Sequence, residues 1–191
     1  MTMPHLTPHL TRRVARHLVL VEDADPILGS AGAQVNATDA KVARSSAGLS
    51  HLPTVVAMGP FDDVAHTEQL TAAFGAVQRL CSAQLVLLGD AATPRWSNAL
   101  TAADVLVPST SSGPTGVLAA LSARRAVVAP ADPLTVALIV PSSAGLVYRR
   151  GDIAGMARAL LRLLNNPGLR YGMGTRAGEV ALRHDRSKRY A

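Results

Sequence analysis

The sequence predicts an α/β protein built on a Rossmann-like, doubly wound parallel sheet. Short apolar runs alternate with segments of helical periodicity between residues 54 and 165, which is the pattern of repeated strand–helix units. The runs at 54–59 and 84–89, TVVAMG and QLVLLG, are apolar on both faces, as strands of a helix-covered parallel sheet are. With 191 residues, 48% of them hydrophobic, the chain can bury one sizeable core.

The part of the chain before residue 54 is less regular. Residues 1–13 contain prolines, histidines and threonines without a period, and we expect a disordered tail. The run HLVLV at 17–21 predicts a short buried strand. Residues 29–54 are rich in Gly, Ser and Ala and are typical of a linker, except for one candidate strand at 41–43.

From residue 54 onward the elements follow in order. Apolar residues recur at helical spacing in 66–82, which predicts one buried helix face. Asp152 is expected to cap a helix at 153–164, and the Asn-Asn-Pro-Gly sequence at 165–168 to end it. The other predicted strands are 105–107, 126–129 and 145–148, and the other predicted helices are 96–103, an alanine-rich helix before 126, 133–140 and 169–188.

The loop 108–116, PSTSSGPTG, joins a predicted strand to the alanine-rich helix. Ligands of doubly wound sheets bind beyond the carboxyl ends of the strands, which is where this loop lies. Small hydroxyl residues and glycines there leave backbone N–H groups facing outward, an arrangement that can hold a phosphate. An ordinary turn with a helix N-cap is the alternative interpretation.

Composition limits the partners and the location of the protein. The net charge of +6 favours polyanions, but only two of the 19 basic residues are lysines and 3% of the chain is aromatic, so we expect no nucleic-acid partner. No apolar run reaches the roughly 18 residues of a membrane span, and the N-terminus lacks the apolar stretch of a secretion signal, which predicts a cytoplasmic protein. Cys81, the single cysteine, is expected to be a buried, unreactive thiol.

Other signals of catalysis are weak. Asp62 and Asp63, like Asp23 and Asp25, fall in turns where aspartate commonly caps helices. A Gly-x-Ser-x-Gly nucleophile elbow and a dinucleotide-binding glycine fingerprint are both absent from the sequence. We therefore predict no catalytic residue, no metal site and no cofactor.

Four stretches, taken in order, resemble the C-terminal half of GT-B-fold glycosyltransferases of the retaining family-four type. They are VVAMG at 55–59, LVLLGD at 85–90, ADVLVPS at 103–109 with the loop, helix and AVVAP that follow, and the segment 145–174. Upstream, residues 15–28 resemble the last strand of the family's N-terminal domain, and residues 39–50 resemble the segment that crosses the cleft.

The resemblance implies that residues 54–191 form a Rossmann-like donor-binding domain with a basic C-terminal helix, and that residues 14–53 are a remnant of the interdomain strand and linker. A nucleotide-sugar donor would place its diphosphate on the loop, and a separate N-terminal glycosyltransferase half would supply the acceptor. The residues expected to contact the donor phosphates through backbone and hydroxyl groups are Gly59, Ser109, Ser112, Gly113, Thr115 and Gly116.

The charged residues of the family are replaced in this chain. Pro60 and Ala65 stand where the family has an arginine and a lysine that neutralise the diphosphate. Ser112 and Ala119 stand where it has two glutamates that bracket the loop. Without cationic groups to stabilise the leaving diphosphate, sugar transfer is expected to slow by orders of magnitude.

This chain departs from the family's pattern in two further places, at residues 124–125 and between residues 89 and 104. Arg124 or Arg125 replaces a glycine, and their side chains either face the phosphates or lie at a solvated helix end. The segment between 89 and 104 is short for the family, so one sheet strand is expected to be absent. We therefore expect a truncated or catalytically degenerate nucleotide-sugar-binding domain, and whether the chain is an enzyme stays open.

A non-catalytic interaction module is the alternative function. Basic side chains gather near the C-terminus, and the final helix could use them to bind a partner protein or an anionic membrane surface, which predicts membrane association of a cytoplasmic protein. These side chains are Arg170, Arg176, Arg183, Arg186, Lys188 and Arg189.

Overall fold

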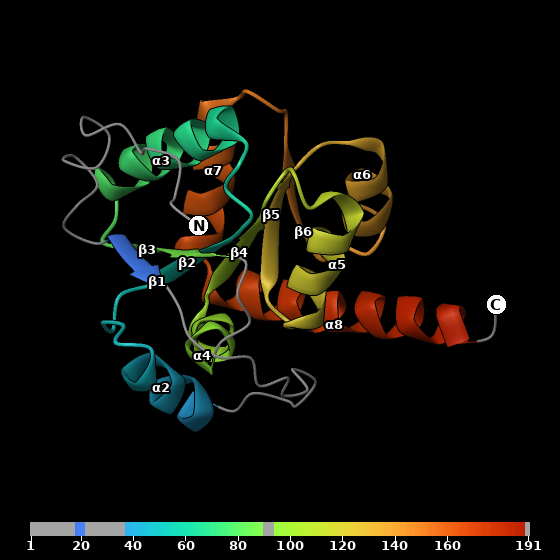
Figure 1. The fold of residues 1–191 in the computed structure, drawn as a ribbon, viewed down its shortest axis with the longest axis horizontal. Helices are drawn as coiled ribbons and strands as arrows, with labels where there is room; N and C mark the ends of the chain where they lie inside the picture. Colours follow the sequence, from blue (N-terminus) through green and yellow to red (C-terminus); the bar gives the residue numbers. More distant parts are fainter. Residues whose placement is uncertain (1–17, 22–36, 90–93, 190–191) are drawn as a thin grey trace.

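The computed structural model describes residues 18–21, 37–89 and 94–189, and it confirms a doubly wound α/β fold (Figure 1). The predicted tail at 1–13 lies outside the described residues, as does the linker up to residue 36. Within the described residues, six strands pair in parallel in the order β1-β3-β2-β4-β5-β6. The strands are β1 (Leu18–Val21), β2 (Thr54–Met58), β3 (Gln84–Leu88), β4 (Val105–Pro108), β5 (Ala126–Pro130) and β6 (Gly145–Tyr148).

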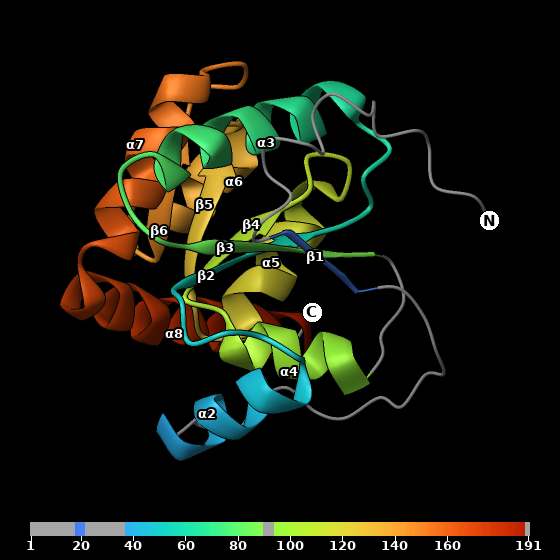
Figure 2. The ribbon, with the colours of Figure 1, turned by 90° about the vertical axis from the view of Figure 1, so that its left-hand side faces the viewer.

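Helices cover both faces of the sheet (Figure 2). Helices α3 and α7 pack together on one face, and α4, α5, α6 and α8 contribute to the core on the other, where α2 packs against α4. The helices are α2 (Ala37–Ser46), α3 (Val64–Gln78), α4 (Pro94–Ala102), α5 (Gly113–Ser122), α6 (Pro133–Ile139), α7 (Ile153–Leu164) and α8 (Pro167–Arg189).

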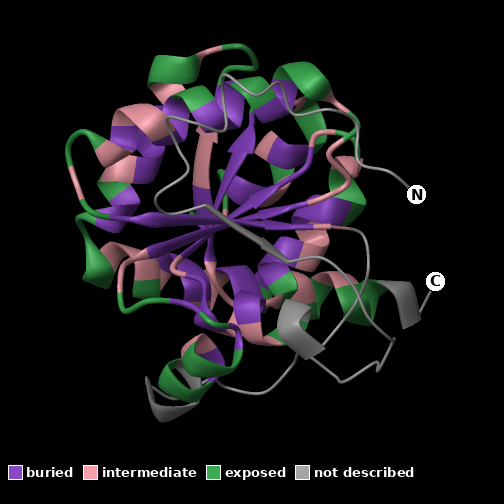
Figure 3. Cartoon of the chain, turned by 60° about the vertical axis from the view of Figure 1, so that its left-hand side comes forward, coloured by how far each residue is buried: buried purple, intermediate pink, exposed green. Residues whose placement is uncertain are grey.

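The double-sided burial of the sheet explains why its strands are apolar at successive positions. On β2, Val55 and Ala57 belong to the core under α3 and α7, whereas Val56 and Met58 belong to the core on the opposite face. Successive side chains of a strand point to opposite faces, so a strand covered on both sides needs apolar residues at every position. Figure 3 shows the resulting buried sheet in purple between the helical layers.

Strand β1 occupies the edge of the sheet beside β3. It pairs in parallel with β3, with Leu18 opposite Leu85 and Val21 opposite Leu88. In the usual Rossmann order 3-2-1-4-5-6, this edge position belongs to a strand that follows β3 in the chain. Here the segment from β3 to β4 contributes only helix α4 among its described residues, and β1 fills the position from the N-terminal side.

The predicted strand at 41–43 is wrong, because these residues lie inside helix α2. Ala43 on α2 and Ala47 just after its end are both buried, and they belong to the same core cluster as Leu100 of α4. Gly48, at a φ of +69°, ends the helix, and the amide of Leu49 donates to the carbonyl of Arg44 at 2.8 Å. Three residues were too short a run to distinguish a strand from one buried helix face.

The carboxylate of Asp104 ties the amino ends of the strands to two helices. Its Oδ2 accepts a hydrogen bond from the Thr54 amide at 2.8 Å and pairs with Arg44 Nη2 of α2 at 2.6 Å. Its Oδ1 pairs with Arg170 Nη2 of α8 at 3.2 Å. The carboxylate therefore joins β2 to α2 and α8 at the amino ends of the strands.

None of the helices among the described residues is both long enough and apolar enough to cross a membrane.

Candidate functional site

The predicted phosphate-binding loop lies between β4 and α5, at the carboxyl ends of the strands. Ser109 is buried, and its hydroxyl accepts a hydrogen bond from the Ser111 amide at 3.1 Å. Ser112 precedes α5 but makes no side-chain cap; its hydroxyl instead donates to the carbonyl of Gly59 at 3.2 Å. The structure thus brings Gly59, at the end of β2, against a loop that is 53 residues away in sequence.

At the beginning of α5 the Gly113 amide donates to the carbonyl of Thr110 at 3.3 Å, and the Gly116 amide donates to the carbonyl of Ser112 at 3.2 Å. Gly113 starts the helix at a φ of +53°, and Pro114 carries no N–H group. The first N–H groups of any helix lack partners within the helix and carry a partial positive charge, which suits an anion. Thr115 is exposed in this first turn, whereas Gly116 is buried and any Cβ added to it would collide with the Cβ of Ser112.

The six predicted residues therefore play different roles. Thr115 is the exposed member of the set, and Gly59, Ser112 and Gly113 are half-buried. Ser109 and Gly116 are buried and shape the loop from beneath. The arrangement can hold an anionic group through the helix start and hydroxyls.

Asp63 connects this loop to two other segments. Its Oδ1 accepts from the His66 amide at 3.0 Å, so it caps α3 as the turn position predicts. Its Oδ2 accepts from the Thr110 hydroxyl at 2.7 Å and lies 3.8 Å from Arg150 Nη1, in the turn after β6. The hydrogen bond from Thr110, with that from the His66 amide, lowers the pKa of Asp63 below its usual value.

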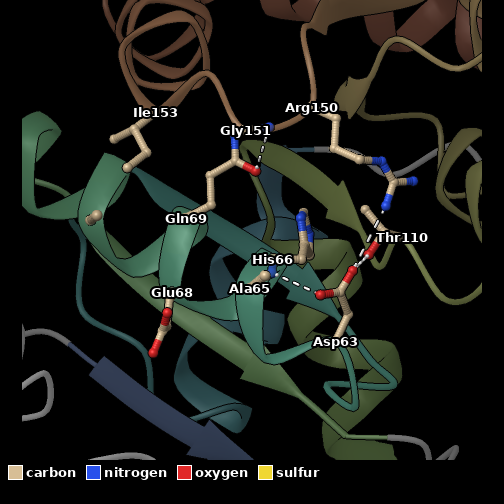
Figure 4. Close-up of a pocket in the computed structure, with 10 residues that line it drawn as sticks. Asp63, Ala65, His66, Glu68, Gln69, Thr110, Arg150, Gly151 and Ile153 are labelled. Atoms are coloured by element: carbon tan, nitrogen blue, oxygen red, sulfur yellow. Dashed lines mark hydrogen bonds and ion pairs between the residues drawn. The ribbon is translucent and has the colours of Figure 1, made fainter.

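Arg150 is a functional candidate that sequence reasoning missed. Its side chain is 61% exposed and reaches the loop at Thr110 through the shared Asp63 carboxylate (Figure 4). Pro60 and Ala65, where the family resemblance would place an arginine and a lysine, lie on the two sides of the same turn between β2 and α3. The sequence around residue 150 does not predict this role. Arg150 and Asp63 are 87 residues apart in the chain, and they meet because the order of the strands brings the ends of β2 and β6 to the same edge of the sheet.

Arg124 and Arg125 do not face the phosphate-binding loop, which was one of the two alternatives that the sequence left open. Both residues follow the C-terminal end of α5, whereas the loop lies at its N-terminal end. Arg125 Nη2 donates to the carbonyl of Thr101, and burial lowers the pKa of Arg125, so its side chain is not a solvated helix-end charge either. Arg124 adopts a φ of +56°, and its side chain lies against Gly178 of α8.

Comparison with solved structures identifies the fold. Sucrose-phosphate synthase from Thermosynechococcus elongatus matches with a TM-score of 0.60 and 20% sequence identity, over 78% of this chain and 48% of that one. WaaG, a glycosyltransferase involved in lipopolysaccharide biosynthesis, matches with a TM-score of 0.60 and 17% identity, over 76% of this chain and 47% of that one. Both neighbours are GT-B glycosyltransferases, and the chain spans about half of their length.

These likenesses show the fold, a Rossmann-like half of the GT-B architecture, and confirm that part of the sequence-based prediction. No protein-family model and no curated protein matches the chain.

Proposed function

We propose that the chain is a glycosyltransferase-like domain that binds the diphosphate of a nucleotide-sugar donor at residues 109–116. The observation that carries this proposal is the contact between Ser112 and Gly59, which sets the start of α5 beside the end of β2. A helix N-terminus with glycines and small hydroxyl residues, at the carboxyl edge of a parallel sheet, is a favourable place for a phosphate. The GT-B fold of the neighbours supports this assignment.

The proposed domain binds its donor but transfers sugar slowly. Transfer needs positive charge to stabilise the departing diphosphate, and Pro60 and Ala65 provide none. Ala119, half-buried on α5, cannot hydrogen-bond a donor hydroxyl as a glutamate would. Arg150 supplies one cation near the loop, but its pairing with Asp63 offsets part of that charge.

An acceptor-binding half is the partner that this proposal requires. The GT-B neighbours are about twice as long as the region that they share with this chain, which supports a second half supplied by another domain or another chain. Co-purification of the full chain with the product of an adjacent reading frame would test this point. Absence of any such complex, with donor binding intact, would favour a domain that acts alone.

Isothermal titration of the full chain tests donor binding directly. We expect heat of binding, together with a rise in the unfolding temperature, from at least one of UDP-, GDP- and ADP-sugars. The same nucleotide without its sugar should retain most of the affinity, because the proposed contacts are to phosphate. If every member of the panel gives neither heat nor a thermal shift, the proposed function is wrong.

Helix α8 supports a second candidate, an interaction module that binds an anionic surface. Figure 1 shows the C-terminal part of α8 extending past α5, and Arg183 and Arg186 are exposed on it. Polybasic segments near a membrane gain about 1 kcal/mol per basic residue from anionic lipids. Co-sedimentation with anionic vesicles that falls when residues 183–191 are deleted would support this candidate, and sedimentation that ignores the deletion would remove it.

A further inference from the structure

Arg150 lies in the wall of a cavity of about 630 Å³ beside the loop at residues 109–116 (Figure 4). The cavity lies between the first half of α3 and the turn from β6 to α7, and Thr110 of the loop lines it as well. The side chain of Arg150 is 61% exposed, so its guanidinium group can be reached from the cavity and from solvent. A cation in this position has room to turn toward a group that is bound at the loop.

The ion pair that holds Arg150 in this structure is weak. Arg150 Nη1 lies 3.8 Å from Asp63 Oδ2, which is longer than a hydrogen bond. Ion pairs between exposed side chains contribute little to stability, because water and salt screen them and because two flexible side chains must be ordered. Arg150 can therefore leave Asp63 at a low cost in free energy.

Asp63 keeps its other partners when Arg150 leaves. Its Oδ2 accepts a hydrogen bond from the Thr110 hydroxyl at 2.7 Å, and its Oδ1 accepts one from the His66 amide at 3.0 Å. These two hydrogen bonds lower the pKa of Asp63 more than the charge of Arg150 does. The carboxylate is therefore held by the loop and by α3, and its position does not depend on Arg150.

The loop itself supplies no positive side chain. Residues 108–116 carry no charge, so an anion at the start of α5 would meet only N–H groups and hydroxyls of this segment. Arg150 follows β6, at the same edge of the sheet as the loop. Of the described arginines, it is the one that an ion pair joins to a residue hydrogen-bonded to this loop, since Asp63 contacts both Arg150 and Thr110.

We propose that Arg150 pairs with a phosphate bound at the loop, and that Asp63 competes with this phosphate for Arg150. This role rests on the proposed function, and it adds a specific residue and a competing partner to that site. A guanidinium group can donate two parallel hydrogen bonds to a phosphate, which is a stronger interaction than its 3.8 Å contact with Asp63. Asp63 therefore lowers the affinity of the site for phosphate, and replacing it should raise that affinity.

Calorimetric titration of the full chain with UDP, GDP, ADP and inorganic pyrophosphate tests the role of Arg150. Arg150→Gln should weaken binding at least about tenfold, because it removes a charged hydrogen-bond partner of the phosphate. Arg149→Gln is the matched control, since Arg149 is also exposed and its replacement changes the net charge equally. This control should bind like the wild type. Without ligand, Arg150→Gln should unfold at the wild-type temperature, because its ion pair is exposed.

Asp63→Asn tests the competition. An asparagine side chain can still accept hydrogen bonds from the Thr110 hydroxyl and the His66 amide, so α3 keeps its cap. The affinity for the probe should rise roughly 2- to 5-fold, which is what an exposed ion pair contributes. In the Arg150→Gln background the same replacement should give no rise, whereas simple repulsion between Asp63 and the phosphate would give equal rises in both backgrounds.

The outcomes separate this role from the proposed function. Equal affinity of Arg150→Gln and Arg149→Gln for a probe that the wild type binds would overturn the role of Arg150 and leave the proposed function standing. No rise for Asp63→Asn, or equal rises in the two backgrounds, would overturn the competition. If the wild type binds none of the four probes, both the proposed function and the role of Arg150 are wrong.

Discussion

At the residue scale, Asp63 is the side chain on which the most segments converge. It caps α3, accepts from Thr110 and faces Arg150, so one carboxylate joins the ends of β2, β4 and β6. Its position after a strand and before a periodic helix predicts the cap. Its contacts with Thr110 and Arg150 were not predictable, because they depend on which strands become neighbours in the sheet.

Replacing Asp63 with alanine should destabilise the protein by about 1–2 kcal/mol, the cost of losing a helix N-cap. The neighbouring Asp62 is exposed, so Asp62→Ala is the matched control and should change the free energy of unfolding by less than about 0.5 kcal/mol. Urea unfolding of both variants measures the difference. Equal stability of the two variants would show that Asp63 does not hold α3.

His66 should make stability depend on pH in a defined window. Burial lowers its pKa in the folded state, outweighing the attraction of Asp63, while the unfolded chain binds a proton near the ordinary value of about 6.5. The unfolded state therefore gains protons first, and stability falls as the pH drops below about 6.5. Above that pH, His66 contributes no dependence.

Urea unfolding between about pH 7.5 and pH 5.5 checks this prediction. His66→Gln should reduce the loss of stability on acidification, because the replacement does not titrate. His51→Gln, at an exposed position, should retain the wild-type loss. Asp63 stays ionised in this window because its pKa is lowered, so a loss that persists in His66→Gln would contradict the assignment to His66.

At the element scale, close approaches of backbone determine how α8 packs. A Cβ at Gly174 would lie 2.5 Å from the carbonyl oxygen of Arg124, at the end of α5. A Cβ at Gly168, in the first turn of the same helix, would meet no atom within 4 Å. The sequence predicts a helix over 169–188, which includes Gly174 but begins one residue after Gly168, and propensity does not show which of the two glycines permits a close contact.

Gly174→Ala should therefore destabilise the protein by about 1–3 kcal/mol, through displacement of α8 from α5. Gly168→Ala should be neutral or stabilising by up to about 1 kcal/mol, because alanine favours the helix more than glycine does. Thermal unfolding of the two variants gives the comparison. A stabilising Gly174→Ala would mean that α8 does not pack closely on Arg124.

Long apolar runs and capping residues made most elements predictable. The strands at 54–58 and 84–88 are predictable because a strand buried on both faces is apolar at successive positions. Helix α7 is predictable because Asp152 caps it and because a helix with one buried face has apolar residues at helical spacing. Helix α2 was missed because the alanines that bury it against α4 are also typical of a linker. The burial of His66 and Gln69 was not predicted, because no sequence pattern distinguishes a buried polar residue of a helix from an exposed one.

At the scale of the whole molecule, Asp104 links parts that the chain keeps far apart. It joins α2, β2 and α8 through Arg44, the Thr54 amide and Arg170. Its side chain is 18% exposed, so its loss leaves two cations poorly solvated. Local sequence signals did not predict this cluster, because its two arginines, Arg44 and Arg170, lie 126 residues apart in the chain.

Asp104→Asn should destabilise the whole sheet by about 2–3 kcal/mol, since it removes the charge that pairs with two arginines. Asp62→Asn, at an exposed position, controls for the chemical change. Hydrogen exchange should report faster opening of both β2 and α8 in Asp104→Asn. Unchanged exchange in both elements would contradict the linking role.

The most direct test of the account is a titration of nucleotide diphosphates into Thr115→Glu and Ser122→Glu. Both positions are exposed on α5, one in its first turn and one at its end. A carboxylate at 115 suits the helix start but repels a bound diphosphate, so the fold should persist while affinity falls at least about tenfold. Ser122→Glu should bind like the wild type. Equal affinity of both variants for a nucleotide that the wild type binds would contradict a donor site at residues 109–116.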